Sequence, residues 1–153
     1  SKGAKLVEFT KFMRALQAQK DEILDLQGFK LTQLSKGDLK SIMNKLWYII
    51  SSLNIGLTKA RLVVGSKALH HLLPDLIPPI DREHTLRLIY GYSPTYGYEE
   101  RMFKRVYFQL WKIGTRNRNT ILLWVGKGFH SSETKVIDNA IIGYVKTKMK
   151  KSR

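Results

Sequence analysis

Residues 35–56 read SKGDLKSIMNKLWYIISSLNIG and decide the fold class. Their apolar residues recur at spacings of three and four, which places them on one face of an α-helix. Ser35, with Asp38 three residues later, is typical of a helix N-terminus, because a hydroxyl accepts a free backbone N–H and an acid suits the first turn. Asn54 and Gly56 predict the end of the helix. We therefore expect a long core helix here.

Similar apolar spacing on both sides of this segment predicts further helices. Such stripes cover residues 5–20, with a continuation to residue 26, residues 102–111 and residues 132–145. Asp81 is a natural N-cap for another helix that reaches Tyr90. No segment shows persuasive strand alternation, so the pattern favours an all-α protein.

Glycine and proline divide the middle of the chain into short units. We expect a short helix that reaches Val64, a turn at Gly65, and a second helix that opens at Ser66 and stops at Pro74. The connector over residues 75–80 contains two consecutive prolines, which should keep it extended and stiff. This order of elements predicts a unit like a helix-hairpin-helix.

Two stretches are predicted to be loops by their glycine, proline and polar content: residues 91–98 and the basic segment 114–119. Residues 121–125 are apolar and fit either a buried helix or a strand. The expected architecture is a compact all-α bundle of six to seven helices, in a single domain over residues 1–153, with a basic C-terminal tail from about residue 146.

The composition is that of an ordinary folded protein. Of the 153 residues, 43% are hydrophobic and 25% are charged, a balance that disordered chains do not have. No apolar stretch approaches the roughly 18 residues of a membrane span. The N-terminus lacks the apolar segment of a secretory signal, so we expect an intracellular protein. The absence of cysteine excludes disulfides, thiolate metal sites and cysteine nucleophiles, and we expect no cofactor.

The charge is the strongest property of the whole chain. Lysine and arginine number 27 against 12 acids, which gives a net charge of +15. Such an excess attracts polyanions, and nucleic acid is the commonest polyanion inside cells. We expect nucleic acid as the partner, and DNA rather than RNA. A basic protein without this function, or one that contacts an anionic membrane, is the alternative, and the oligomeric state is not predicted.

A lysine and an aspartate flank the proline-containing connector. Lys67 is followed 14 residues later by Asp81, and a helix–connector–helix unit delivers both side chains to one place. In a strongly basic chain, this pairing favours a function in nucleic-acid chemistry.

The segment Val64-Gly65-Ser66-Lys67-Ala68, the connector, and Ile80-Asp81-Arg82-Glu83-His84 resemble the core of helix-hairpin-helix DNA glycosylases. In the endonuclease III-like branch of that family, a Val-Gly-Arg-Lys-Thr-Ala segment is followed by a proline-containing connector and a Val-Asp-Thr-His segment. The resemblance covers residues 62–87. It aligns Lys67 with the nucleophilic lysine, Asp81 with the catalytic aspartate, Gly65 with the second hairpin glycine, and Arg87 with an arginine soon after the aspartate.

The chain departs from the family pattern in three places. The family hairpin begins Leu-Pro-Gly, where this chain has Leu62-Val63. The interval from lysine to aspartate is a few residues short, and His84 lies three residues after the aspartate instead of two. These departures concern the hairpin and also the spacing around the charged pair, so the resemblance is partial.

The chemistry that the resemblance implies is coherent. Cleavage of an N-glycosidic bond builds positive charge on the sugar, which the Asp81 carboxylate would stabilise. Lys67, beside cations such as Arg82, would attack C1′ and form a Schiff base. The target base must leave the stack. The further nucleic-acid contacts that we expect are Gly65, Ser66, Arg82, Arg87, Tyr92, Tyr96, Arg116 and Arg118, with Tyr90 and Tyr98 as additional stacking surfaces.

Simpler structural roles compete with these assignments. Asp81 is more often an N-cap than a catalyst, and one residue can be both. His70 and His71 are adjacent on a helix and point about 100° apart, so we expect no metal site and a buried, hydrogen-bonded role for one of them. Lys135 and Asp138 have the spacing of a surface ion pair, which we favour over a second polar cluster beside the first.

The sequence therefore supports three functions. The leading one is a nucleic-acid-binding protein that acts as a DNA glycosylase in repair or defence, with Lys67 and Asp81 as catalytic residues. The second is a non-catalytic DNA- or RNA-binding protein, and the third is a helical interaction module for an acidic protein partner.

Overall fold

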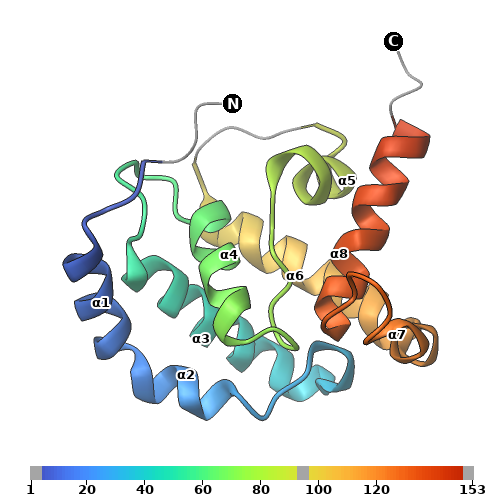
Figure 1. Cartoon of the computed structure of the whole chain (residues 1–153), viewed down its shortest axis with the longest axis horizontal. Coiled ribbons are helices and arrows are strands. Elements are labelled where there is room, and N and C mark those ends of the chain that lie inside the picture. The colour runs from blue at the N-terminus through green and yellow to red at the C-terminus, as the bar shows by residue number, and fades with distance from the viewer. Residues whose placement is uncertain (1–4, 93–96, 150–153) are drawn as a thin grey trace.

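Helix α3 (Lys36–Leu53) crosses the lower half of the molecule and confirms the helix predicted from residues 35–56 (Figure 1). The computed structural model describes residues 5–92 and 97–149. Ser35 Oγ accepts the N–H of Asp38 at 3.1 Å, so the predicted cap is formed. Asn54 ends the helix in the left-handed region, with φ at 43°, a conformation that asparagine tolerates better than most residues.

The described residues contain helices throughout and no named strand, so the all-α class is confirmed. The α-helices besides α3 are α1 (Phe9–Ala18), α2 (Lys20–Leu26), α4 (Leu62–Leu72), α5 (Arg87–Tyr90), α6 (Glu99–Arg116), α7 (Arg118–Trp124) and α8 (Glu133–Tyr144). Three further helical turns are η1 (Leu31–Gln33), η2 (Arg82–Leu86) and η3 (Val145–Met149). The number of α-helices slightly exceeds the predicted six to seven.

The predicted turn at Gly65 is wrong. Helix α4 passes without a break through Gly65 and Ser66. A Cβ atom on Gly65 would lie 2.7 Å from Cγ2 of Ile50 on α3, a separation that real side chains do not show. Glycine is therefore required here for the close approach of two helices, and no hairpin turn forms at this residue.

The basic loop predicted over residues 114–119 is also wrong. Helix α6 continues through Gly114 to its last residue, and only Asn117 separates it from α7. Gly114 is buried, and a Cβ atom there would lie 3.3 Å from Cγ2 of Thr32 and 3.4 Å from Cδ1 of Ile137. The glycine again marks a helix contact. The undecided segment 121–125 is helical as far as Trp124.

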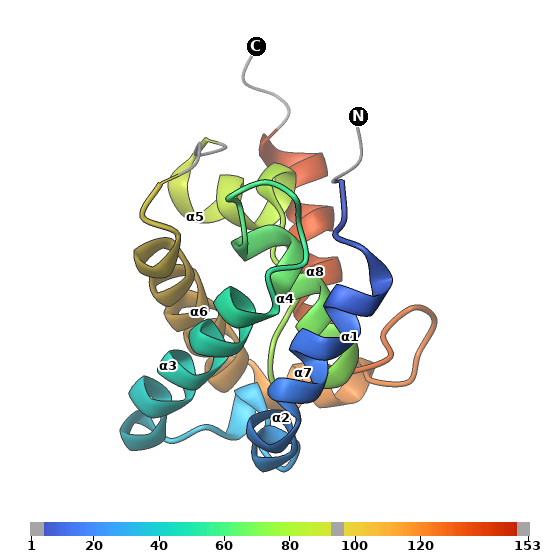
Figure 2. The same ribbon diagram turned by 90° about the vertical axis from the view of Figure 1, so that its left-hand side faces the viewer.

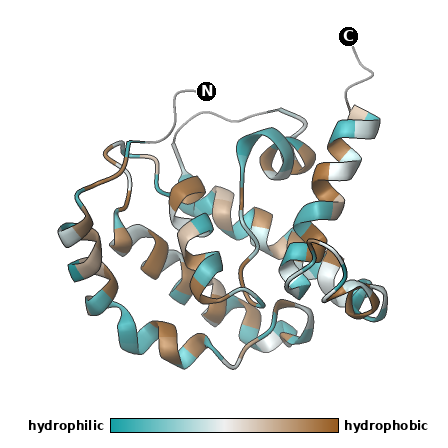
Figure 3. Ribbon diagram, viewed as in Figure 1, coloured by the Kyte–Doolittle hydropathy of each residue, from teal (hydrophilic) through white to brown (hydrophobic). Residues whose placement is uncertain are grey.

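A shared hydrophobic core lies between the helices, and most helices present one apolar and one polar side (Figure 3). The rings of Trp47 on α3 and Phe103 on α6 stack with centroids 5.8 Å apart. Tyr107 is fully buried, and its hydroxyl donates to the carbonyl of Leu76 at 3.0 Å. This bond holds the connector that follows α4 against α6, because a buried carbonyl needs a donor.

The first turn of α8 is fastened to the start of the same connector. Ser132 caps the helix by accepting the N–H of Lys135 at 3.2 Å. Thr134 donates its hydroxyl to the carbonyl of Pro74, and the buried carboxylate of Glu133 accepts the hydroxyl of Thr32. Helix α8 therefore lies beside the connector in a fixed register.

The C-terminal segment is helical as far as it is described, so the basic tail predicted from about residue 146 begins within η3, which carries Lys146 and Lys148. Residues 150–153 lie outside the described residues. None of the helices in residues 5–92 and 97–149 combines the length and the apolar character needed to cross a membrane.

Candidate functional site

Lys67 and Asp81 are brought together by a hydrogen bond between their neighbours. Lys67 follows Ser66, which is fully buried, and Asp81 follows Ile80. The Oγ of Ser66 accepts the N–H of Ile80 at 3.1 Å and lies 3.2 Å from the carbonyl of Val63, to which it donates. A bond of this kind contributes about 0.5–1.5 kcal/mol, and it joins the middle of α4 to the end of the connector.

A pocket of about 510 Å³ opens between α4, the connector and α8. Its lining residues are Lys67, His70, His71 and Pro74, then Pro79 and Asp81, then Ser131, Lys135, Asp138 and Ile142. The volume lies within the range of small-molecule sites. Both residues predicted to be catalytic therefore line one pocket.

Asp81 is the N-cap of η2, as the sequence predicts. Its Oδ1 accepts the N–H groups of His84 at 2.7 Å and Thr85 at 3.1 Å. Its Oδ2 lies 2.9 Å from Nδ1 of His84. Both carboxylate oxygens thus have partners, and the side chain is held in one orientation at the edge of the pocket.

The balance of forces on Asp81 favours its charged form. Burial is the largest single influence and opposes ionisation, but hydrogen bonds from the His84 ring and from the N–H groups of His84 and Thr85 together outweigh it. The pKa of Asp81 is therefore lower than its ordinary value. Asp81 therefore presents a fixed negative charge at the edge of the pocket.

The two lysines of the pocket differ in their surroundings. Lys67 is exposed, and among the described residues it has no hydrogen-bond or ion-pair partner. Lys135 Nζ lies 2.6 Å from Oδ2 of Asp138, whose side chain is only 5% exposed. Lys67 is therefore the amine that is available to a ligand, while Lys135 is engaged with a buried acid.

Lys135 and Asp138 form the ion pair that the sequence predicts, but the pair does not lie on the surface as expected. The pair exists, but Asp138 is buried and both residues line the pocket. The spacing of three residues predicts the contact without predicting its depth. That depth follows from the contacts of Thr134 and Glu133 that draw the start of α8 inward.

His70 is the hydrogen-bonded histidine that the sequence predicts, and His71 is exposed. The Nδ1–H of His70 donates to the carbonyl of Ile77 at 2.8 Å, which leaves Nε2 without a proton in the neutral ring. Burial, followed by smaller effects that partly oppose one another, lowers the pKa of His70 below its ordinary value. In the described part of the chain, no three His, Asp or Glu side chains are placed to hold a metal ion.

Tyr90, Tyr92 and Tyr98 do not line this pocket. Tyr90 packs under the guanidinium of Arg105, 4.7 Å from its ring centroid, and meets Tyr92 edge-on with centroids 6.2 Å apart. Tyr92 and Tyr98 are exposed, and Tyr96 lies outside the described residues. The described tyrosines of this cluster therefore supply no aromatic wall to the pocket.

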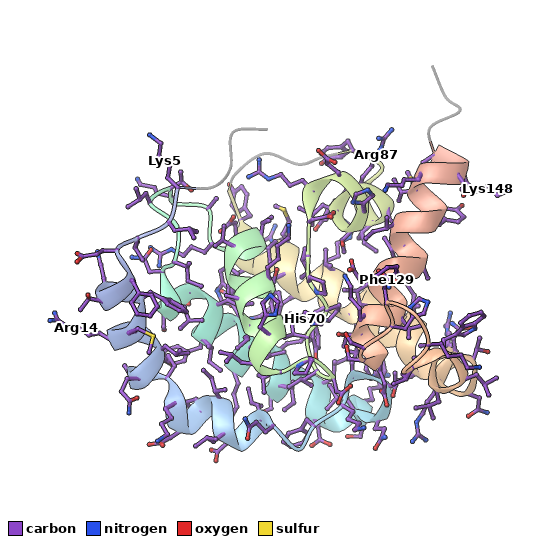
Figure 4. The ribbon with its side chains drawn as sticks, viewed as in Figure 1. Lys5, Arg14, His70, Arg87, Phe129 and Lys148 are labelled. Carbon is purple, nitrogen blue, oxygen red and sulfur yellow. The ribbon has the colours of Figure 1, made fainter. Side chains whose placement is uncertain are left out.

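The arginines predicted to bind nucleic acid are spread over the molecule. Arg82 follows Asp81 directly, Arg87 lies on α5, and Arg116 and Arg118 flank the corner between α6 and α7. Figure 4 shows Arg87 and the further cations Lys5, Arg14 and Lys148 at different edges of the view, with His70 near its centre. None of these cations lines the pocket. Their role as contacts to the phosphates of a nucleic acid that extends beyond the pocket stays a prediction.

A second hollow of about 510 Å³ lies on another side of α8, among residues such as Leu88, Ile121 and Ile141. Its lining contains no charged side chain. It offers no groups for the expected chemistry, so the pocket of Lys67 and Asp81 is the stronger candidate.

Comparison of the chain with protein-family models, with curated proteins and with solved structures found no match. The function must therefore be argued from the site itself.

Proposed function

We propose that the protein binds DNA and cleaves the N-glycosidic bond of a nucleotide whose base enters the pocket of Lys67 and Asp81. The observation that carries the proposal is that an unpaired amine and a fixed carboxylate line one pocket of about 510 Å³. The net charge of +15 supplies attraction to phosphates. The resemblance of residues 62–87 to DNA glycosylases points to the same pair of residues.

The proposed reaction uses these two groups and water. The neutral amine of Lys67 forms a bond to C1′ while the bond from C1′ to the base nitrogen breaks, and the base leaves with the electron pair and takes up a proton. The bound amine then loses a proton, the nitrogen lone pair opens the bond from C1′ to O4′, and O4′ takes up a proton, which gives a protonated imine. Water hydrolyses the imine to the free amine and an aldehyde. Asp81 stabilises the positive charge on the sugar.

Borohydride trapping on duplex DNA that contains an abasic site tests the role of Lys67. The abasic aldehyde forms an imine with an active-site amine, and reduction makes the adduct permanent. We expect an adduct that Lys67→Ala removes and that the exposed lysine variant Lys40→Ala retains. Because basic proteins form background imines, an adduct that survives in Lys67→Ala contradicts the assignment.

The same substrates separate the roles of the two residues. Asp81→Asn should slow release of a base from DNA that carries damaged bases, yet it should leave trapping on a preformed abasic site. This follows because the abasic site no longer requires cleavage of the glycosidic bond. Equal loss of both activities would indicate that Asp81 only maintains the structure.

A second function is favoured by the capping role of Asp81, whose oxygens are both hydrogen-bonded within the protein. In that case the chain binds nucleic acid without chemistry, and Lys67 contacts a phosphate. Steep salt dependence of binding together with no adduct and no base release would select this function.

A further inference from the structure

A second polar hollow adjoins the pocket of Lys67 and Asp81. Its volume is about 640 Å³, and its walls include Trp124, Lys127, Phe129, His130, Lys135 and Asn139. Lys135 also lines the first pocket, as does Ser131, which follows His130 directly. The two hollows therefore share a wall and lie in succession along the start of α8.

The loop that carries these residues exposes aromatic surface. It follows α7 and projects from the body of the molecule at the right of Figure 2. Phe129 is 90% exposed and Trp124 is 51% exposed. The Phe129 ring is almost fully open to solvent and about half of the Trp124 side chain is, and exposed aromatic side chains that lie near one another commonly mark a binding surface.

The loop is nevertheless held in a defined conformation. Gly126 and Gly128 have φ values of +83° and +57°, which L side chains rarely adopt. The N–H of Gly126 donates to the carbonyl of His130 at 2.7 Å. From α8, Nδ2 of Asn139 donates to the carbonyl of Phe129 at 3.3 Å. The backbone that carries Phe129 is thus held in place within the protein itself.

The hollow combines flat rings with positive charge. The rings of Trp124 and His130 lie 5.8 Å apart in an edge-to-face arrangement, and Lys127 Nζ lies 5.6 Å from the Trp124 centroid. No acid is among its lining residues. Aromatic faces beside ammonium groups suit a ligand that pairs a planar ring with an anion, which describes a nucleotide.

We infer that this hollow is a second nucleobase subsite, in which the base next to the one in the first pocket stacks on Phe129 and Trp124. Lys127 contacts the phosphate of that nucleotide. The inference rests on the proposed function, since it places the neighbour of the reacting nucleotide. Stacking requires a free base face, so the subsite takes an unpaired nucleotide and the protein prefers single-stranded or locally opened DNA.

Fluorescence anisotropy with a labelled single-stranded oligothymidylate tests the subsite. Loss of base–aromatic stacking by Phe129→Ala should weaken binding roughly 5- to 150-fold, the equivalent of about 1–3 kcal/mol. Phe129→Trp should retain binding. The matched control is Phe9→Ala on α1, because Phe9 is also exposed, at 72%, and does not line either pocket.

Each outcome decides the inference. Equal binding by Phe129→Ala and Phe9→Ala overturns it, provided that the wild-type protein binds the oligonucleotide. No binding of the oligonucleotide by the wild-type protein at low salt also overturns the inference, whereas the proposed function fails only if duplex DNA with an abasic site gives no adduct. Vesicles of phosphatidylglycerol form the last arm: if Phe129→Ala loses vesicle binding and keeps oligonucleotide binding, the loop contacts a membrane instead.

Discussion

Replacement of Gly65 by alanine should destabilise the protein through one steric contact. The added Cβ would meet Cγ2 of Ile50 at 2.7 Å and the carbonyl oxygen of Ile50 at 3.3 Å. Carbon atoms prefer separations of about 3.5–4.0 Å, so α3 and α4 must move apart or the Ile50 side chain must shift. Ile50 is 1% exposed, and its neighbours leave little room for that shift.

Two terms of opposite sign set the magnitude. Overpacking of a well-packed core costs about 1–3 kcal/mol, while alanine stabilises a helix interior by about 0.5–1 kcal/mol relative to glycine. Gly143 on α8 isolates the second term, because a Cβ there meets nothing within 4 Å. We expect Gly143→Ala to be more stable than the wild type, and Gly65→Ala to be less stable than Gly143→Ala by about 1–3 kcal/mol.

Urea unfolding followed by circular dichroism measures the three free energies of unfolding. Equal stability of the two variants would refute the packing argument. Binding of DNA by Gly65→Ala adds a further distinction. If Gly65 lay in a hairpin that contacts phosphate, its substitution would weaken the binding of DNA. Because Gly65 is a buried packing residue, we expect its substitution to lower the stability of the protein first.

Two further predictions concern pH and are measured by urea unfolding at a series of pH values. Asp81 has a lowered pKa in the folded protein, so its contribution to stability is complete above its ordinary pKa of 3.8 and is lost as the pH falls through the folded value. Asp81→Ala should therefore lower the free energy of unfolding by about 0.5–2 kcal/mol at pH 7. The difference in stability between this variant and the wild type should shrink in acid. A difference that does not change with pH would contradict this account. The pKa of His70 is also lowered, mainly by burial, so its contribution is complete above its ordinary pKa of 6.5 and is lost as the pH falls through the folded value. In His70→Gln, the free energy of unfolding should therefore fall less below pH 6.5 than it does in the wild type. The same dependence of this free energy on pH in both proteins would show that His70 is not responsible.

The helix caps could be predicted because their signals are local. Ser35, Asp81 and Ser132 each accept backbone N–H groups three or four residues ahead, within the reach of a short sequence window. The apolar stripe of residues 35–56 is equally local, since one helix face repeats every three to four residues. These signals are sufficient to predict the all-α class.

The roles of Gly65 and Gly114 could not be predicted, because they depend on partners far along the chain. Gly65 is required by Ile50 on α3, and Gly114 by Thr32 and Ile137. A single sequence does not distinguish a glycine that permits a turn from a glycine that permits close contact between two helices. The predicted breaks at 65 and 114 therefore became helix interiors.

The candidate site was predicted in part. The sequence places Lys67 and Asp81 together, and both line one pocket, although their catalytic roles stay predictions. It does not predict that Asp138 is buried beside them, because the depth of α8 is set by contacts with Pro74 and Thr32.

The hydrogen bond from the N–H of Ile80 to Oγ of Ser66 holds together the two backbone segments that carry Lys67 and Asp81, and it involves no charged group. Neither Lys67 nor Asp81 takes part in it. Because Lys67 has no hydrogen-bond or ion-pair partner among the described residues, it can be exchanged for another residue type while the backbone around it keeps its shape, whereas exchange of Asp81 would also remove the cap of η2. Engineered versions that preserve Ser66 and Asp81 can therefore present a new functional group at position 67, at an inherited distance from the carboxylate, as expected when function is grafted onto a fold.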